Sequence, residues 1–168
     1  MSDYKKPYVI AEIGCNHKGD MAIAKELIKV AKIFCNAHAV KFQKRNNKEL
    51  LTEEQYNQPH PNPANSYGST YGEHREYLEF DVNQHAELKA FCEDIGIDYA
   101  SSVWDVTSAK EIASLSPKFI KIPSACNNNT KMLEWLCKNY QGELHVSTGM
   151  TSKVEIDALV NLFKRHQR

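Results

Sequence analysis

Lysine, serine and acidic side chains stand within or just after short apolar runs of this sequence, where they could bind anions and move protons. Lys41 and Lys121 each lie inside an apolar run. Because an unpaired ammonium group is costly to bury, each lysine must face a ligand or a partner. Two lysines with neighbouring hydroxyl groups could hold a substrate that carries phosphate and carboxylate. Glu12 is the one acid of the set, and we expect it to position a sugar or to move a proton.

Polar side chains follow each of five apolar runs, at the point where a parallel strand would end. Ligands bind at the carboxyl ends of parallel strands, so these side chains are candidates for one common site. Singly, a strand lysine is typical of a sheet edge and a serine of a helix cap, but five agreeing strand ends favour a site. A Schiff-base aldolase is a competing use of a lysine in a parallel α/β fold, although no single lysine is set apart for it. The candidates are Glu12, Lys41, Gln43, Ser102, Trp104, Lys121, Ser124 and Ser147.

The runs that carry these residues alternate with helical patterns. Asp81 and Gln84 form a capping box before a long helix, and Gly96 is placed to end that helix. Ser152 and Glu155 form a second capping box before the last helix. The predicted strands span residues 8–13, 39–42, 99–103, 119–122 and 144–147.

Five consecutive βα units predict an α/β fold with a parallel sheet and right-handed crossovers. No glycine-rich nucleotide-binding motif follows the first strand, which disfavours a doubly wound nucleotide-binding sheet. A (β/α)₈ TIM barrel usually needs about 250 residues, so the 168 residues supply about the first five of its eight units. A small, complete five-stranded open sheet is the alternative, and periodicity alone leaves it open.

A long segment, residues 46–79, separates the second predicted strand from the second long helix. Segments of this length inside compact domains are usually functional lids or disordered. Its prolines, glycines and tyrosines favour an ordered but mobile flap, in which Tyr67, Tyr71 and Tyr77 could form a hydrophobic anchor. A tolerated surface insertion is the alternative.

Charge and composition exclude several classes of protein. Lys plus Arg and Asp plus Glu number 21 each, so no overall basic field points to nucleic acid or an anionic membrane. No apolar run approaches the roughly 20 residues of a membrane span, and the first residues show no signal peptide. The five cysteines are odd in number and form no C-x-x-C pair, which favours reduced thiols in the cytoplasm.

The histidines show no metal-binding pattern of close pairs. His17, His74 and His145 lie nearest the candidate residues in the sequence, but no H-E-x-x-H motif joins them. We therefore predict no metal site made only from residues of this chain.

Four motifs carry a resemblance to a known family. The run 10–17, I-A-E-I-G-C-N-H, with Gly19 resembles the opening I-A-E-I-G-x-N-H-x-G of the sialic acid synthase family. The runs 40–43 (V-K-F-Q), 121–124 (K-I-P-S) and 147–150 (S-T-G-M) resemble three of its strand-end motifs. The motifs stand in the right order from residue 8 to about residue 160, which covers nearly the whole chain.

The resemblance implies a reaction and roles for the candidates. Phosphoenolpyruvate would condense with an N-acetylated hexose, N-acetylmannosamine or a related sugar, to give a nine-carbon sialic-acid-like sugar acid and phosphate. Glu12 and Gln43 would face the sugar, with Glu12 as the catalytic residue, and Trp104 would stand beside the substrate. The groups that would hold phosphoenolpyruvate are Lys41, Ser102, Lys121, Ser124 and Ser147.

Two departures from the family pattern concern the acceptor. Cys126 stands where the family has an acid near the sugar, and residues 101–104 read S-S-V-W where S-T-P-F is usual. These changes leave the acceptor sugar open. A related synthase that uses a phosphorylated aldose is one alternative, with Lys44 and Arg45 as the only obvious extra cations. A non-catalytic, anion-binding half-barrel is another.

The resemblance also implies parts that this sequence does not supply. Residues 1–168 would be the N-terminal part of the barrel, without the family's C-terminal antifreeze-like domain. A divalent metal, manganese or magnesium, would be needed by the full-length enzyme, held by two histidines beyond Arg168. The full-length enzyme would be a homodimer, and we expect the 168-residue chain to have no synthase activity by itself.

Overall fold

One parallel sheet of five strands forms the centre of the protein, in a computed structural model that describes residues 5–168. Every pair of neighbouring strands is parallel. The spatial order follows the chain without reversal, which is the order of a barrel and not of a doubly wound sheet. The predicted parallel α/β fold is confirmed. The strands are β1 (Ile10–Gly14), β2 (Ala39–Lys44), β3 (Asp98–Val103), β4 (Phe119–Ile122) and β5 (Glu143–Val146).

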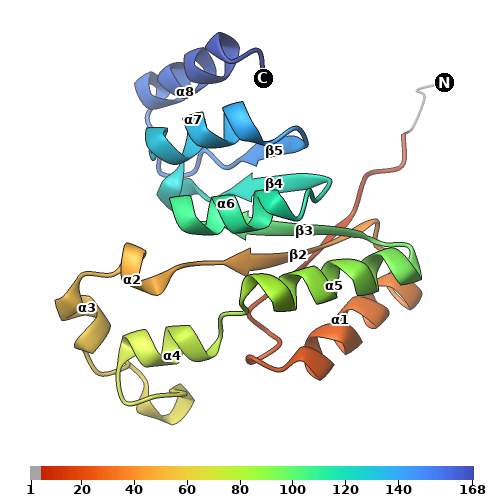
Figure 1. Cartoon of the computed structure of the whole chain (residues 1–168), viewed down its shortest axis with the longest axis vertical. Coiled ribbons are helices and arrows are strands. Elements are labelled where there is room, and N and C mark those ends of the chain that lie inside the picture. The colour runs from red at the N-terminus through yellow and green to blue at the C-terminus, as the bar shows by residue number, and fades with distance from the viewer. Residues whose placement is uncertain (1–4) are drawn as a thin grey trace.

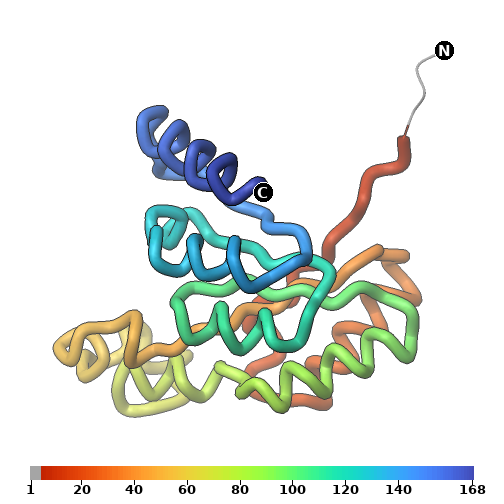
Figure 2. Tube along the Cα trace, turned by 45° about the horizontal axis from the view of Figure 1, so that its top comes forward, coloured from red at the N-terminus to blue at the C-terminus, as the bar shows by residue number. Residues whose placement is uncertain are grey.

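Five longer helices follow or join these strands. Figure 1 shows α5, α6 and α7 in front of the sheet, and Figure 2 shows the successive units stepping round from α1 to α8. No helix of the described residues has the length and apolar character needed to cross a membrane. The helices are α1 (Met21–Ile33), α5 (Val82–Ile95), α6 (Val106–Ser114), α7 (Thr130–Asn139) and α8 (Lys153–Arg165).

The predicted helix ends are present. Asp81 and Gln84 make a reciprocal capping box at the start of α5, and Ser152 and Glu155 make another at the start of α8. Gly96 ends α5 with φ of +73°, a left-handed conformation that glycine adopts without a steric penalty. These local signals fix where each helix begins, and therefore how each strand end is followed.

Alternation along the strands divides the sheet into two faces. Val40 and Phe42 of β2 are fully buried beneath α1 and α5, in a cluster with Ile28 and Leu88. Lys41 lies between them and therefore points to the opposite face. A second apolar cluster lies toward the other end of the helix-covered face, where β4 packs against α6 and α7. It includes Ile112, Ile120, Ile122, Leu133 and Leu136.

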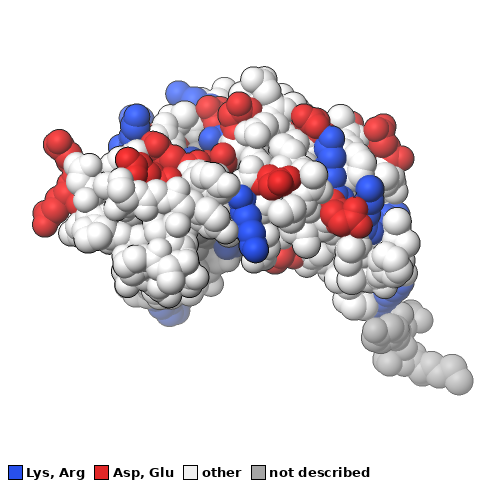
Figure 3. All heavy atoms as spheres, turned by 90° about the horizontal axis from the view of Figure 1, so that it is seen from below, with Lys and Arg blue, Asp and Glu red and all other residues white. Residues whose placement is uncertain are grey.

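The inner face, away from these helices, has a small apolar floor. Ala39, Ala100 and Phe119 form it, with Ile10 packed against them. The molecule is hollowed on this side, and Figure 3 shows the hollow from one end of the protein. Acidic and basic side chains are interspersed over the face in view, as expected from the balanced charge. The polar candidates stand toward the carboxyl ends of the strands above this floor.

Residues 46–79, which we call the insertion, contain helices that the sequence reading did not predict. Its helices are α2 (Asn47–Leu50), α3 (Glu53–Asn57), η1 (Pro63–Asn65) and α4 (Tyr71–Tyr77). Capping boxes at Thr52 and Thr70 start α3 and α4, so the helical starts were encoded locally. Tyr67 and Tyr77 stack with ring centroids 4.6 Å apart, while Tyr71 lies beside His60 instead.

Candidate functional site

Lys41 is the centre of a polar cluster on the inner face. Its ammonium group forms an ion pair with Glu12 of β1 and donates a hydrogen bond of 3.0 Å to Ser102 Oγ of β3. The side chain of Lys41 is 12% exposed, whereas that of Glu12 is 51% exposed. The lysine is therefore shielded from water, and the carboxylate remains open to a ligand.

Lys121 joins this cluster from the next strand. It pairs in register with Ser102, so β2, β3 and β4 present Lys41, Ser102 and Lys121 side by side. Burial lowers the pKa of Lys121 below its ordinary value of 10.5, and the positive charge of Lys41 lowers that pKa further. Two ammonium groups that repel each other across a hydroxyl are stabilised by a bound anion. The arrangement is therefore suited to a ligand with several negative charges.

A glycine leaves space for the side chains of Glu12 and Gln43. Gly14 at the end of β1 has φ of +57°, and β1 shifts its pairing register with β2 at this point. A Cβ atom at Gly14 would lie 3.1 Å from Gln43 Nε2 and 3.5 Å from Glu12 Oε1. The structure thus brings Glu12 and Gln43 to the same place, beside Lys41.

The two remaining serines lie close together across the ends of β4 and β5. Ser124 opens the short helix η2 (Ser124–Cys126), and Ser147 follows β5 directly. The backbone N–H of Ser147 donates to the Ile122 carbonyl at 3.0 Å, which extends the β4–β5 pairing past the strand end. A Cβ atom at Gly149 would lie 3.0 Å from Ser124 Oγ, so the turn after Ser147 packs on the Ser124 hydroxyl.

Trp104 is held by Arg45. The Arg45 guanidinium carbon lies 5.9 Å from the Trp104 ring centroid, and the tryptophan also packs against the β4–α6–α7 cluster. Its indole N–H is buried without a partner among the described residues. A free donor suits a ligand contact, but the placement of Trp104 beside a substrate stays a prediction.

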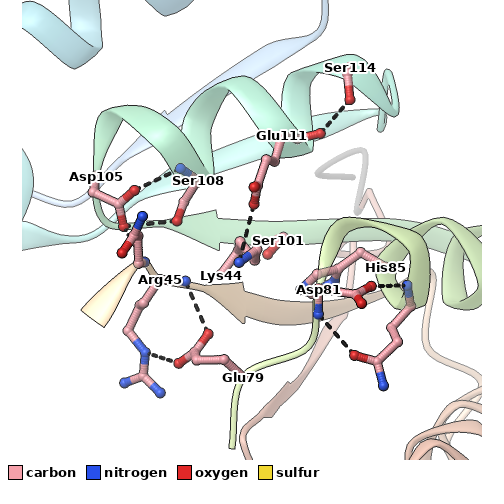
Figure 4. A network of polar contacts seen from close by, with 12 residues as sticks. Lys44, Arg45, Glu79, Asp81, His85, Ser101, Asp105, Ser108, Glu111 and Ser114 are labelled. Carbon is pink, nitrogen blue, oxygen red and sulfur yellow. Dashed lines mark hydrogen bonds and ion pairs between the residues drawn. The ribbon is translucent and has the colours of Figure 1, made fainter. Parts of the chain in front are cut away.

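Lys44 and Arg45, the suggested cations for a second phosphate, are both paired. Lys44 lies on the helix-covered face, where its ammonium is 3.2 Å from Glu111 of α6 (Figure 4). Arg45 bonds Glu79 through its side chain at 2.5 Å and through its backbone N–H at 3.0 Å. Both cations therefore have carboxylate partners already, and Lys44 points away from Lys41.

His17 is also away from the polar cluster, although the sequence places it near Glu12. It is 2% exposed and stacks on Phe80, with ring centroids 4.0 Å apart. Burial lowers its pKa to about 4, so the ring is neutral near neutral pH. The chain turns at Gly14 and carries His17 to the helix-covered side, which makes it a packing residue.

His74 and His145 lie in separate parts of the structure. His74 lies in α4 beside His60, whereas His145 of β5 stacks on Phe119 of the inner face at 4.4 Å. Among residues 5–168, no three His, Cys, Asp or Glu side chains are grouped so that they could hold a metal ion.

Cys126 occupies a buried position next to the site. It is 7% exposed and belongs to the apolar β4–α6–α7 cluster. Burial raises the pKa of its thiol, so the sulfur is a poor substitute for an ionised acid. The placement of Cys126 beside an acceptor sugar stays a prediction.

Two acidic residues that were not among the predicted site residues, Asp105 and Glu79, bind the segments next to the site. Asp105 is 1% exposed; it caps α6 through Ser108 and accepts a 2.7 Å bond from the backbone N–H of Asn46 (Figure 4). Glu79 bonds Arg45, so the two ends of the insertion are fastened to each other. The helix-cap pattern Asp-x-x-Ser was available at Asp105, but nothing local announces the Arg45–Glu79 pair.

Comparison with known proteins identifies relatives over almost the whole chain. A model of the NeuB family matches residues 27–168. The N-acetylneuraminate-9-phosphate synthase of Drosophila melanogaster is 36% identical over 157 residues, which cover 94% of this chain and 41% of that protein. The N,N'-diacetyllegionaminic acid synthase of Campylobacter jejuni is 30% identical over 158 residues, 94% of this chain and 47% of that protein. The chain thus spans somewhat less than half the length of these relatives.

A solved structure supports the barrel type of the fold. The N-acetylneuraminic acid synthetase of Leptospira borgpetersenii superposes with a TM-score of 0.79 at 23% identity, over 99% of this chain and 55% of that chain. With the strand order described above, this gives a (β/α)₈ TIM-barrel type of fold, of which five βα units are present.

Proposed function

The chain belongs to the NeuB family, and on that premise we propose that it provides the phosphoenolpyruvate-binding part of a synthase that makes nine-carbon sugar acids. The acceptor would be an N-acetylated hexose, N-acetylmannosamine or a related sugar. C3 of phosphoenolpyruvate would bond to the aldehyde carbon, water would add to C2, and the C2–oxygen bond to phosphate would break.

The observation that carries this proposal is the row formed by Lys41, Ser102 and Lys121. Three neighbouring strands present two ammonium groups and a hydroxyl on one face, with Lys41 bonded to Ser102 at 3.0 Å. Phosphoenolpyruvate carries both a phosphate and a carboxylate. It therefore matches the two lysine charges better than a ligand with a single carboxylate would. The paired turns of Ser124 and Ser147 would supply further hydroxyl donors at the next strand ends.

Glu12 would act on the acceptor side. Its carboxylate is held by Lys41 yet half exposed, so it can accept from a sugar hydroxyl or move a proton at the aldehyde oxygen. Gln43, across Gly14, would donate or accept with its amide at the same end of the site. Trp104 would provide an apolar wall if the acceptor reaches Arg45.

A phosphorylated acceptor is the second candidate, since three relatives are named N-acetylneuraminate-9-phosphate synthase. It would need cations beyond the phosphoenolpyruvate site. Lys44 and Arg45 have partners in Glu111 and Glu79, so using either one would require breaking an ion pair. This favours an unphosphorylated acceptor.

For the whole protein, the proposal includes a closed barrel, a bound metal and a dimer. Residues 1–168 would form the N-terminal part of the barrel, and further βα units would close it. A divalent metal, manganese or magnesium, would polarise the aldehyde when bound, with ligands from outside this chain. The full-length protein would assemble as a homodimer in the cytoplasm.

Turnover measurements test the reaction. A polypeptide that joins this chain to the remaining units of a NeuB-family barrel should release phosphate from phosphoenolpyruvate only when an N-acetylated hexose is present. Glu12→Gln should lower kcat by about 100-fold or more, because the only proposed proton-transfer group is removed. Faster turnover with a 6-phosphorylated sugar than with the free sugar would support the second candidate instead. Release that is independent of any sugar would contradict both.

A further inference from the structure

The turns that carry Ser124 and Ser147 are tied together by one buried side chain, that of Asn127. This residue follows η2 directly, so it belongs to the same turn as Ser124. It is only 6% exposed. Its amide nitrogen donates to the Ser147 carbonyl at 2.9 Å and to Thr151 Oγ1 at 2.6 Å. Both donors of the amide are thus used on the turn that follows β5.

The same turn is closed by a relay from Thr151. Its hydroxyl accepts from Asn127 and donates to the Gly149 carbonyl at 3.0 Å. Gly149 in turn packs on Ser124, since a Cβ atom there would lie 3.0 Å from Ser124 Oγ. The contacts form a closed ring that runs from Ser124 through Asn127, Thr151 and Gly149 back to Ser124.

The buried amide of Asn127 fixes the distance between the turn after β4 and the turn after β5. Backbone pairing of β4 and β5 ends at the Ser147 N–H, and beyond that point this ring connects the turns of the two serines. Hydroxyl groups that hold one anion from two loops must keep their separation to within a fraction of an ångström. Among residues 5–168, the bonds to Ser147 and Thr151 are the two hydrogen bonds that the buried Asn127 side chain makes.

We propose that Asn127 is a positioning residue for the anion site, which sets the spacing of the Ser124 and Ser147 turns around phosphoenolpyruvate. The inference rests on the proposed function. Asn127 does not touch the anion; it acts through the Ser147 carbonyl and the Thr151 hydroxyl. A two-ended ligand such as phosphoenolpyruvate depends on that spacing more than inorganic phosphate does, because phosphate can be held by one turn alone.

The neighbouring asparagines provide matched controls. Asn129 caps α7 through a 3.1 Å bond from Met132 N–H, so Asn129→Ala should lower stability without altering the ring. Asn128 is exposed and makes no side-chain hydrogen bond among the described residues, so Asn128→Ala should change neither property. Comparing alanine substitutions at the three consecutive asparagines therefore separates an effect on ligand affinity from an effect on protein stability.

Calorimetric titration of the chain with phosphoenolpyruvate and with inorganic phosphate tests the inference. Asn127→Ala should weaken phosphoenolpyruvate about tenfold and phosphate less than threefold, so that the ratio of the two affinities falls. Thr151→Val removes one link of the ring from a half-buried position and should lower the same ratio, even if Asn127→Ala fails to fold.

Two results would overturn this inference and are distinct from failure of the proposed function. Unchanged affinity ratios in Thr151→Val and in folded Asn127→Ala would show that the ring does not position the site. An equal fall of the ratio in Asn129→Ala would show that loss of stability is the cause. Failure of the unmodified chain to bind phosphoenolpyruvate at all would instead refute the proposed function.

Discussion

The ammonium group of Lys41 lies 3.0 Å from the hydroxyl oxygen of Ser102, on the adjacent strand. Lys41 also holds Glu12, so one lysine orients a hydroxyl on one side and a carboxylate on the other. A single point charge therefore links the proposed phosphoenolpyruvate site to the proposed sugar site.

Removing the Ser102 hydroxyl should weaken anion binding modestly. Ser102→Ala should raise the dissociation constant for phosphoenolpyruvate about fivefold, which corresponds to roughly 1 kcal/mol for one hydrogen bond. Ser101→Ala is the matched control, because Ser101 is fully buried on the opposite face of the same strand. Calorimetry on both variants checks the prediction. Equal losses of affinity would show that the effect comes from strand packing.

Phosphoenolpyruvate binding should weaken at alkaline pH. Burial and the nearby Lys41 charge lower the pKa of Lys121, and a bound anion would favour the protonated form. Affinity should hold while Lys121 is protonated and fall as the pH rises through that lowered pKa. Titrations from about pH 8 to pH 10 avoid ionisation of the phosphate group itself, whose pKa is near 6. Lys121→Arg should remove the decline, and its persistence in that variant would assign it to another group.

The Arg45–Glu79 pair should control the mobility of the insertion. Glu79→Gln leaves the Arg45 charge without its partner at a site where both side chains are about 10% exposed or less. Losing one member of a buried pair costs about 3 kcal/mol, and here the loss should be local. Hydrogen exchange within residues 46–79 should accelerate, whereas exchange in β2 and β3 should not. The control is Glu54→Gln, at an exposed residue of α3; the same acceleration there would contradict the prediction.

The protein should lose stability in mild acid through its buried histidines. Burial lowers the pKa of His17 to about 4 and that of His85 to about 3, against an ordinary value of 6.5. The unfolded chain therefore binds protons below about pH 6.5 while the folded chain does not, so stability falls between pH 6.5 and pH 4. His17 should account for a loss on the order of 2 kcal/mol.

His17→Asn tests that prediction. The side-chain oxygen of asparagine can still accept from Gly19 N–H, as His17 Nδ1 does at 3.1 Å. Urea denaturation across this pH range should give a shallower fall in the free energy of unfolding than for the unmodified protein. Curves that run parallel would show that His17 does not titrate as described.

Much of the fold was predictable because its signals are local. Alternating apolar residues located the five strands to within two residues at each end, and capping boxes at Asp81 and Ser152 located two helices. The same capping pattern is present at Thr52 and Thr70, but the prolines and glycines of the insertion favour a flap without predicting its helices.

The positions of site residues were predictable where the alternation of side chains along a strand determines which face of the sheet each residue occupies. Alternation places Lys41 and Gln43 together on one face, and it also places Lys44 on the other, although Lys44 was considered for a second phosphate. His17 is close to Glu12 in the sequence, but the turn at Gly14 carries it away from the polar cluster, and closeness in sequence does not predict that turn. The Arg45–Glu79 pair joins residues 34 apart, and no local pattern encodes such a contact.

Titration of phosphoenolpyruvate into the chain and into its lysine variants is the most direct test of the strand-end anion site. Lys41→Ala and Lys121→Ala should each raise the dissociation constant at least tenfold, while Lys44→Ala, on the opposite face, should leave it within twofold. Binding that is unchanged in both Lys41→Ala and Lys121→Ala would contradict the account.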